Sequence, residues 1–392
     1  MQIATSNPKL PRVDQILVGF SPGDAASQFA LSVKRELEAL GLQSQLYAEF
    51  MSPDAHDWCR PIQEYRPSSD DSLIFHYTIG SETVIHTFKN AMVAKRGILY
   101  QNITPAHFFA PYQKTDLTAQ IIHGQLEFGR NQLESVVRLS DFLLTVSEFN
   151  ARELRPFARC DVDLAPIFLD ENQWLEISED EPTSRALADG AVNFLFTGRI
   201  APNKCQEDVI RLFAWYHRHI NVNSRLILVG KPNPENYFAD LRRLACDLGI
   251  DHRVWFTGYI SQAQLLAIYR NTHLFVSMSE HEGFGVPLLE AMRFDIPILA
   301  YAAPGVAETL SGSGIVFNQK NFPELAELCH LVVTNAGEIR TQVLAGQKER
   351  LTYFSSSELS TKLRSVLHKH FAVGDFSGPN HSTGQRVEGQ AP

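Results

Sequence analysis

One stretch, residues 274–292, constrains the fold more than any other, because it reads as a strand, a loop and a helix in succession. Residues 274–276 (LFV) are apolar strand formers and predict a buried parallel strand. A polar, glycine-containing loop follows them. Pro287 suits the first turn of a helix, since its missing N–H would have no partner there. The stretch therefore predicts one strand–loop–helix unit of a parallel α/β sheet.

Two carboxylates flank the start of this helix: Glu282 lies in the loop, and Glu290 lies just past the first helical turn. Carboxylates only accept hydrogen bonds, so they suit ligands rich in hydroxyl groups. Stabilisation of the helix N-terminus is the simpler interpretation of an isolated acidic pair. The free amides of a helix start can also bind an anion or a sugar hydroxyl, and glycines let such a ligand approach. The amides concerned belong to Gly283, Phe284, Gly285 and Val286.

A second motif, FTGRIAPNK at residues 196–204, places two cations after another apolar strand. Gly198 permits a tight turn there, and Arg199 and Lys204 follow it. Arginine offers a planar fork of donors and lysine a compact charge, so the pair suits a diphosphate. A solvated surface pair is the alternative interpretation. The acidic motif downstream in the same domain favours the phosphate site.

Short apolar segments alternate with amphipathic helical patterns along most of the chain, which predicts parallel sheets covered on both faces. Two domains are the default for 392 residues, and two such domains facing each other form a cleft at the carboxyl ends of their strands. We predict strands at residues 15–20, 43–48, 72–77, 97–100 and 142–146 of the first domain, and at 192–197, 224–229, 253–256, 274–276 and 296–300 of the second. The predicted helices include 29–40, 126–139, 208–217 and 237–248.

Composition also indicates the domain boundaries. The acidic, polar residues 171–190 are interpreted as the interdomain linker. This places an N-terminal Rossmann-like domain at residues 1–170 and a C-terminal Rossmann-like domain at residues 191–355. A helical pattern at 356–373 follows, and then a polar segment at 374–392 that we expect to be disordered.

Charge and cysteine usage narrow the class of protein. The net charge of −9 argues against nucleic acid as the main partner. No apolar run approaches the roughly 18 residues needed to span a bilayer, and residues 1–15 lack the apolar core of a signal peptide. We therefore expect a cytoplasmic protein. The 5 cysteines contain no CxxC pair, which favours free thiols over a disulfide framework or a zinc site.

Together, EGFGVPLLEAM after an apolar strand and GRIAPNK upstream of it resemble the E-x7-E and G-R-x-x-P-x-K motifs of the retaining glycosyltransferases of family 4. The resemblance implies the GT-B fold, in which two Rossmann-like domains face each other across a cleft and the last helix packs back across them. It implies that Glu282 lies against the donor sugar and that Glu290 holds the ribose of the nucleotide. Arg199 and Lys204 would bind the donor diphosphate and stabilise the leaving nucleotide, and the loop amides from Phe284 onward would face the donor.

The N-terminal half extends this resemblance. Gly23 follows the first strand, at the turn that reaches across the cleft to the donor in the family. The strings FHYTIGSE at residues 75–82 and LYQNITPAHFF at residues 99–109 are similar to HYxIGS and YHNITP in a subgroup of bacterial polysaccharide mannosyltransferases. Gln101 stands where that subgroup has a histidine close to the donor sugar. An amide can bond a sugar hydroxyl but cannot carry a proton.

Two histidines were candidates to compensate for this change. His76 is interpreted either as a site residue or as a buried histidine satisfied by the backbone, and His107 as structural. The candidate catalytic residues are therefore Glu282, Gln101 and His76. No metal or cofactor is expected, because no Asp-x-Asp pair lies at a strand end beside the donor motifs. Residues 161–163 have that form but are interpreted as a surface loop.

The sequence thus predicts a retaining hexosyltransferase that moves a hexose from a nucleotide-diphosphate sugar to a hydroxyl of a glycan or lipid-linked saccharide, in cell-surface polysaccharide biosynthesis. The subgroup resemblance favours mannose from GDP-mannose, and the departing phosphate would act as the base, as proposed for the family. Two alternatives stay open. One is another enzyme on the same architecture, a nucleotide-sugar epimerase or a sugar phosphorylase. The other is a catalytically silent nucleotide-sugar-binding subunit, which Gln101 keeps open.

Contact with the inner face of a membrane is a further open alternative, since a lipid-linked acceptor would require it. Lys89, Lys95 and Arg96 lie near an apolar stretch of the N-terminal domain. A solvated helix face explains these cations equally well.

Overall fold

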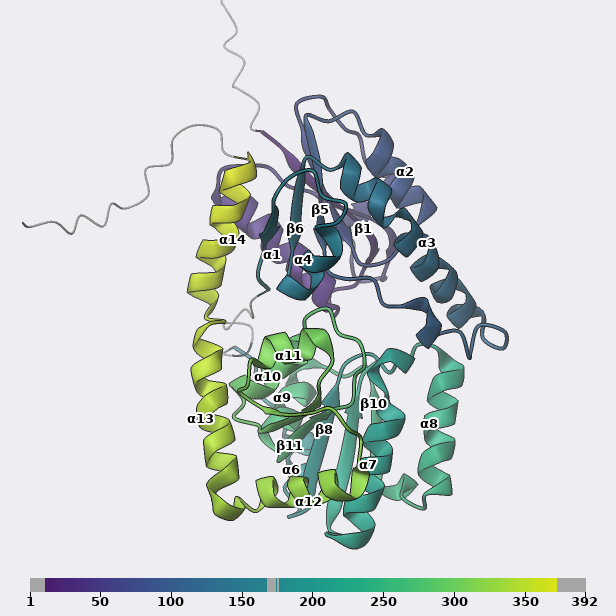
Figure 1. Ribbon diagram of the computed structural model, residues 1–392, viewed down its shortest axis with the longest axis vertical. Coiled ribbons are helices and arrows are strands. Elements are labelled where there is room, and N and C mark those ends of the chain that lie inside the picture. The colour runs from purple at the N-terminus through teal and green to yellow at the C-terminus, as the bar shows by residue number, and fades with distance from the viewer. Residues whose placement is uncertain (1–10, 168–173, 175, 372–392) are drawn as a thin grey trace, which may run out of the picture.

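The computed structural model describes residues 11–167, 174 and 176–371. It shows two α/β domains, joined along one side by the last two helices of the chain (Figure 1). Each domain is built on one sheet whose paired strands all run parallel. Helices cover both faces of each sheet. The predicted class, two doubly wound α/β domains, is confirmed.

The first sheet has seven strands in the order β3-β2-β1-β4-β5-β6-β7, and the second has six in the order β10-β9-β8-β11-β12-β13. The strands of the first sheet are β1 (Val13–Phe20), β2 (Leu46–Met51), β3 (Cys59–Pro61), β4 (Ser72–Tyr77), β5 (Lys95–Tyr100), β6 (Phe142–Thr145) and β7 (Val162–Leu164). Those of the second sheet are β8 (Val192–Thr197), β9 (Ser224–Val229), β10 (Val254–Gly258), β11 (Leu274–Ser277), β12 (Ile298–Tyr301) and β13 (Ile315–Phe317).

The helices begin where the sequence supplies caps. Asp24, Ser81, Asp116 and Ser147 each accept a backbone N–H at the start of a helix of the first domain. The helices of that domain are α1 (Ala25–Ala39), α2 (Glu82–Asn90), α3 (Leu117–Leu139) and α4 (Glu148–Leu154). The second domain has α6 (Glu181–Leu187), α7 (Gln206–His219), α8 (Glu235–Asp247), α9 (Gln262–Arg270), α10 (Val286–Arg293), α11 (Pro304–Leu310), α12 (Phe322–Val333) and α13 (Ile339–Thr352), and α14 (Ser356–Phe371) follows.

The central strands are buried on both faces, as parallel sheets require. Along β1, Ile16 and Val18 pack into one apolar cluster, while Leu17, which points to the opposite face, packs into another. At roughly 25 cal/mol per Å² of apolar surface, this two-sided burial is the main term that holds each domain together.

The strand order reverses between β1 and β4 in the first sheet and between β8 and β11 in the second. Ligands of doubly wound sheets bind beside such reversals, outside the carboxyl ends of the strands. The segments that follow β1 and β4, and those that follow β8 and β11, contain the motifs singled out in the sequence.

Element boundaries differ from prediction in a few places. Strand β2 begins at Leu46, three residues later than expected, and α1 begins at Ala25 because Asp24 caps it. The pattern of the sequence did not indicate β3, β13 or α13, which are short edge strands and a weakly amphipathic helix.

One interpretation was wrong. The sequence predicts a surface loop at residues 161–163, yet Val162–Leu164 forms β7 at the edge of the first sheet. Asp163 there accepts bonds from Lys369 Nζ and His370 Nε2, both at 2.8 Å. The Asp-x-Asp string thus helps to hold the last helix rather than to face the cleft.

Helix α14 packs against α1 of the first domain, after α13 has run along the second (Figure 1). Glu36 on α1 accepts bonds from Ser360 Oγ at 2.6 Å and Arg364 Nε at 2.9 Å. The helix pattern predicted at 356–373 is present at Ser356–Phe371, and the segment predicted as disordered, 374–392, lies outside the described residues.

The region predicted as a linker, 171–190, lies partly outside the described residues and contains α6, which packs against α9. Within the described part of the chain, no helix combines the length and the apolar character that crossing a membrane requires.

Candidate active site

Loops from the carboxyl ends of both sheets meet between the two domains. Gly23 follows β1, and a Cβ at this position would lie 3.4 Å from the ring of Tyr259, which follows β10. Asn102 follows β5, and its Oδ1 lies 3.1 Å from Nε2 of the buried His281, which follows β11. The two domains therefore contact each other along the edge where a bound ligand is expected.

The loop after β11 is packed so closely that two glycines are required. A Cβ at Gly283 would lie 2.4 Å from the backbone oxygen of Gln101 in the other domain. A Cβ at Gly305 would lie 2.2 Å from the backbone oxygen of Glu282. Gly285 ends the loop in the left-handed region, at φ 93°, which glycine adopts without strain. These contacts fix the backbone that carries Glu282 and leads into α10.

Lys204 and Glu282, predicted as phosphate-side and sugar-side residues, are in contact. Lys204 ends a short 3₁₀ turn (Pro202–Lys204) after β8. Its Nζ lies 2.5 Å from Glu282 Oε2, and both side chains are 15% exposed. The pair is therefore partly desolvated but open to a ligand that competes for either partner.

Glu290 lies on the first turns of α10, and its carboxyl accepts a hydrogen bond from Tyr269 OH at 2.6 Å. The buried Tyr269 OH also lies 3.1 Å from Oγ1 of Thr197, at the end of β8. Burial raises the pKa of Glu290 to about 7, and the bond from Tyr269 opposes that rise. This relay links the predicted ribose-side carboxylate to the strand end that precedes the two cations.

Arg199 follows that strand end and is exposed. Its backbone oxygen accepts a bond from Gln206 Nε2 at 2.9 Å, which holds the main chain of the turn. Among the residues described, its guanidinium has no ion pair or hydrogen bond. Gly198 and Gly230 are in backbone contact beneath it, both with positive φ. Arg199 can therefore bind an anion without first breaking an ion pair, whereas Lys204 is paired with Glu282.

Gln101 and His76 lie together on the first-domain side. Gln101 Nε2 is 3.3 Å from His76 Nδ1, and Nε2 of the buried His76 is 2.7 Å from Gln15 Oε1. Burial lowers the pKa of His76 to about 3, so the ring is neutral at ordinary pH. Of the two interpretations of His76, the buried one describes its surroundings, although side chains rather than backbone satisfy it.

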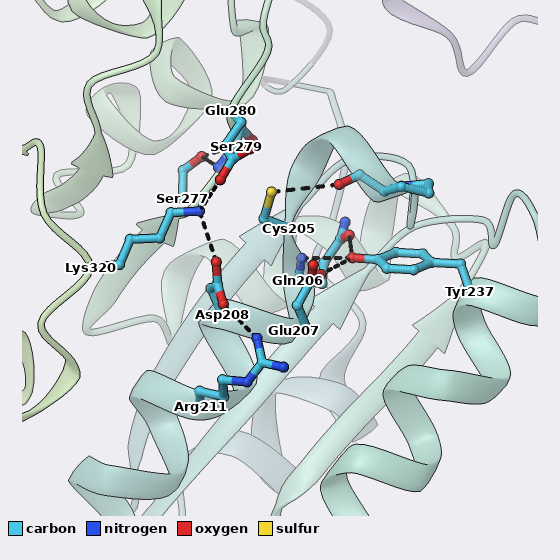
Figure 2. A network of polar contacts seen from close by, with 11 residues as sticks. Cys205, Gln206, Glu207, Asp208, Arg211, Tyr237, Ser277, Ser279, Glu280 and Lys320 are labelled. Atoms are coloured by element: carbon cyan, nitrogen blue, oxygen red, sulfur yellow. Dashed lines mark hydrogen bonds and ion pairs between the residues drawn. The ribbon is translucent and has the colours of Figure 1, made fainter. Parts of the chain in front are cut away.

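A polar network lies beside the loop that follows β11 (Figure 2). Lys320 Nζ lies 2.8 Å from both Asp208 and Glu280, and it packs over the ring of Tyr301. Cys205, Asp208 and Glu280 are close enough to form a three-ligand metal site. Lys320 and Arg211 together pair with these two carboxylates, and burial raises the pKa of the Cys205 thiol to about 12. The cluster therefore ties the β11 loop to α7.

A separate cavity of about 450 Å³ lies at the opposite edge of the first sheet, beside the amino ends of β1 and β2. Arg12, Ser44, Tyr47 and Arg60 are among its lining residues. It is remote from the loops that follow the carboxyl ends of the strands.

Sequence reasoning missed several residues that shape the cleft. Asn102 has φ 78°, a conformation that asparagine adopts more readily than most residues, and it lies within the NITP string that was noted. Glu308 accepts bonds from the amides of Glu148 and Phe149 across the domain boundary. The other missed residues are Gln15, Tyr269 and His281. Gln15 and Tyr269 lie within apolar elements, and His281 lies in the polar loop beside Glu282 without a motif role of its own.

The chain is similar to solved structures over nearly its whole described length. It superposes on WaaG, a glycosyltransferase involved in lipopolysaccharide biosynthesis, with a TM-score of 0.64 at 15% identity, covering 92% of this chain and 100% of the other. Anabaena HepE in complex with UDP-glucose gives a TM-score of 0.65 at 16% identity, covering 91% and 99%. The fold is the GT-B fold of glycosyltransferases.

Sequence comparison gives a family match in the second domain. Residues 178–350 match the family described as Glycosyl transferases group 1. Over 105 residues the chain is 37% identical to the GDP-mannose:cellobiosyl-diphosphopolyprenol alpha-mannosyltransferase of Xanthomonas campestris, covering 26% of this chain and 27% of that protein. Over 165 residues it is 27% identical to the serotype-specific mannosyltransferase WbdA of Escherichia coli, covering 41% of this chain and 20% of that protein. The matches thus span about a fifth to a quarter of these relatives, and the predicted resemblance to glycosyltransferases is confirmed.

Proposed function

We propose that this protein is a retaining hexosyltransferase whose C-terminal domain binds a nucleotide-diphosphate sugar. The observation that carries the proposal is the convergence of Arg199, the Lys204–Glu282 pair and the Tyr269–Glu290 pair at the β8/β11 reversal. Cations suit a diphosphate, and carboxylates suit the hydroxyls of ribose and hexose.

The chemistry follows from this arrangement. Arg199 and Lys204 hold the diphosphate and offset the negative charge that develops on it as the bond to the sugar C1 breaks. The acceptor hydroxyl forms a new bond to C1 on the face that the nucleotide leaves, and its proton passes to the departing phosphate. Glu282, released from Lys204 by the diphosphate, then accepts hydrogen bonds from the hexose. Closure of the two domains excludes water that would otherwise hydrolyse the donor.

We further propose GDP-mannose as the donor and a glycan or lipid-linked saccharide as the acceptor. The support is the similarity to enzymes named for GDP-mannose and for mannosyl transfer. UDP-glucose is the main alternative, since the similar HepE binds it. We infer that no metal is needed, because Arg199 and Lys204 supply positive charge beside the diphosphate.

A thermal-shift panel of nucleotide sugars tests the proposal. A ligand at about 100 times its dissociation constant stabilises the fold by roughly 2.7 kcal/mol. GDP-mannose is expected to raise the melting temperature more than UDP-glucose, and Glu290→Ala and Lys204→Ala should each strongly reduce the shift while His107→Ala retains it. If both site variants keep the full shift, the site assignment is wrong.

A catalytically silent nucleotide-sugar-binding subunit is the alternative function, and it stays open because Gln101 cannot carry a proton. Release of GDP from GDP-mannose by the purified protein separates the two: binding without any turnover, with or without saccharide acceptors, favours the scaffold. An epimerised sugar formed from the donor alone would instead indicate an epimerase.

The proposal of a membrane contact is supported by the lipid-linked acceptor and not by the cations Lys89, Lys95 and Arg96. Arg96 donates to three carbonyl oxygens at the end of α2, Lys95 donates to the carbonyl of His370, and Lys89 donates to Gln132. These side chains are thus engaged within the protein. Flotation with anionic vesicles measures the contact directly, and absence of co-flotation would remove it.

A further inference from the structure

A chain of polar side chains crosses the interior of the first sheet and ends at the cleft. It runs from Ser44, ahead of β2, through Gln15 on β1 and His76 on β4 to Gln101 after β5. Gln15 Nε2 lies 3.0 Å from Ser44 Oγ, and Gln15 Oε1 lies 2.7 Å from His76 Nε2. The link from His76 Nδ1 to Gln101 Nε2 is 3.3 Å. Ser44, Gln15 and His76 are buried, whereas Gln101 is partly exposed.

The direction of each hydrogen bond follows from the atoms involved. An amide oxygen only accepts, so the oxygen of Gln15 requires the proton of His76 to be on Nε2. Nδ1 of the neutral ring is then an acceptor, and it accepts from the Gln101 amide nitrogen. The amide oxygen of Gln101 is left over from this chain as an acceptor.

The ring of His76 stays neutral because of where it lies. Burial lowers its pKa to about 3, and no charged group of the described residues contributes to that shift. On the neighbouring strands, Asp14 pairs with Arg12, and Lys95 donates to the carbonyl of His370, so neither side chain is engaged with the ring. A proton shuttle would need a pKa close to the working pH.

Gln101 is also placed at the proposed site by its backbone. Its carbonyl oxygen lies against the Cα of Gly283, so closely that a Cβ there would approach it to 2.4 Å. Gly283 follows Glu282 directly. The side chain of Gln101 therefore stands at the domain boundary beside the loop that carries the sugar-side carboxylate.

We propose that Gln15 and His76 are positioning residues that hold the Gln101 amide so that its oxygen accepts a hydrogen bond from a hydroxyl of the donor hexose. The inference rests on the proposed function, since it requires a nucleotide sugar in the C-terminal domain. It gives the buried histidine a role in orientation and removes it from the proton-transfer chemistry. Gln101 then contacts the sugar of the donor, whereas the nucleotide is bound by the C-terminal domain.

The test compares the dissociation constants of GDP-mannose and GDP, and of UDP-glucose and UDP, by titration calorimetry. The sugar increment is the ratio of the two constants in each pair. Gln15→Leu removes the acceptor for His76 Nε2–H, so the proton shifts to Nδ1 and the Gln101 amide loses its acceptor. We expect the increment to fall roughly threefold to tenfold, the value of one hydrogen bond, with nucleotide affinity unchanged. Gln342→Leu, at an exposed position on α13, is the matched control.

A second variant distinguishes positioning from general structural damage. Gln15→Glu puts a carboxylate against His76 Nε2, which raises the pKa of the ring. Once protonated, Nδ1 becomes a donor and can no longer accept from Gln101. The sugar increment of this variant should therefore fall as the pH is lowered from 8 to 5.5. In the wild type His76 stays neutral over this range, so its protonation does not alter the increment. Nitrogen NMR of ¹⁵N-histidine-labelled protein should show the Nε2–H tautomer of His76 throughout this range in the wild type.

The outcomes separate the two proposals. If the wild type binds no nucleotide, the proposed function fails and this inference fails with it. If it binds nucleotide sugars but Gln15→Leu and Gln15→Glu keep the wild-type increment at every pH, the function stands and the positioning role is overturned. An Nδ1–H tautomer in the wild-type spectrum overturns the positioning role independently of any ligand, including the case in which Gln15→Leu fails to fold.

Discussion

Lys204 Nζ lies 2.5 Å from the Glu282 carboxylate, so the ligand-free site neutralises its own charges. Both side chains are partly buried, and leaving either without a partner costs free energy. A diphosphate that binds Lys204 would therefore release Glu282 at the moment when the hexose arrives beside it. If the proposed function is correct, the ion pair would couple recognition of the phosphates to recognition of the sugar.

Replacing the cation of this pair should weaken nucleotide binding. Lys204→Ala removes a charge-assisted hydrogen bond worth about 1.5–3 kcal/mol and leaves Glu282 as an unpaired acid that repels the diphosphate. We expect the dissociation constant of GDP to rise roughly 10- to 100-fold in titration calorimetry. Lys348→Ala, at an exposed position on α13, is the control. An unchanged constant for Lys204→Ala would place the phosphates elsewhere.

Nucleotide affinity should depend on pH through Glu290. Burial raises the pKa of this carboxyl to about 7 in the ligand-free protein, and the ionised form accepts stronger hydrogen bonds from the ribose hydroxyls than the protonated form does. Binding of GDP should therefore weaken as the pH falls below 7, by up to about tenfold per pH unit. Glu290→Gln should bind weakly at every pH. Equal pH profiles for the wild type and this variant would contradict the assignment.

Glu290 also predicts the pH dependence of stability. Its folded-state pKa, about 7, lies above the ordinary 4.5, so the folded protein holds the proton more tightly than the unfolded chain. The resulting stability is fully present below pH 4.5 and is lost as the pH rises through 7. The Glu290→Gln variant should lack this loss. Its free energy of unfolding in urea at pH 8 should exceed that of the wild type by on the order of 1–3 kcal/mol. A variant less stable than the wild type at pH 8 would show that burial does not penalise the ionised carboxylate.

The sequence predicted the local parts of this site because their determinants are adjacent in the chain. Glu290 and Pro287 share one strand–loop–helix unit, and Arg199 follows directly on an apolar strand. The partners of these residues could not be predicted in the same way. Tyr269 contacts Glu290 from another helix, α9. In the sequence it fits the apolar pattern of that helix, so nothing indicated its contact with Glu290.

Contacts between the domains could not be predicted from the sequence either, because they depend on how the two folded domains dock. The bond between Asn102 and His281 joins residues that no local pattern relates. Edge strand β7 was missed because its three residues alternate apolar and acidic side chains without the apolar run that marks a central strand. The role of Asp163 in holding α14 then became apparent only from the packing.

Glu308 provides the clearest test of the domain docking. It lies on α11 of the second domain, and its carboxylate oxygens accept bonds at 2.6 and 2.8 Å from the amides of Glu148 and Phe149. These amides start α4 of the first domain, where a negative charge is favourable. Glu308→Ala should remove about 1.5–3 kcal/mol from the contact between the domains.

The expected result is a larger radius of gyration in small-angle X-ray scattering of the ligand-free variant, because fewer bonds then hold the domains together. Bound GDP-mannose should partly restore the compact form by bridging the cleft. Glu327→Ala removes an exposed carboxylate from α12 of the same domain and should scatter as the wild type does. A Glu308→Ala protein with the wild-type radius would mean that other contacts, such as those of Asn102 with His281 and of Ser147 with Gly283, suffice to keep the domains docked.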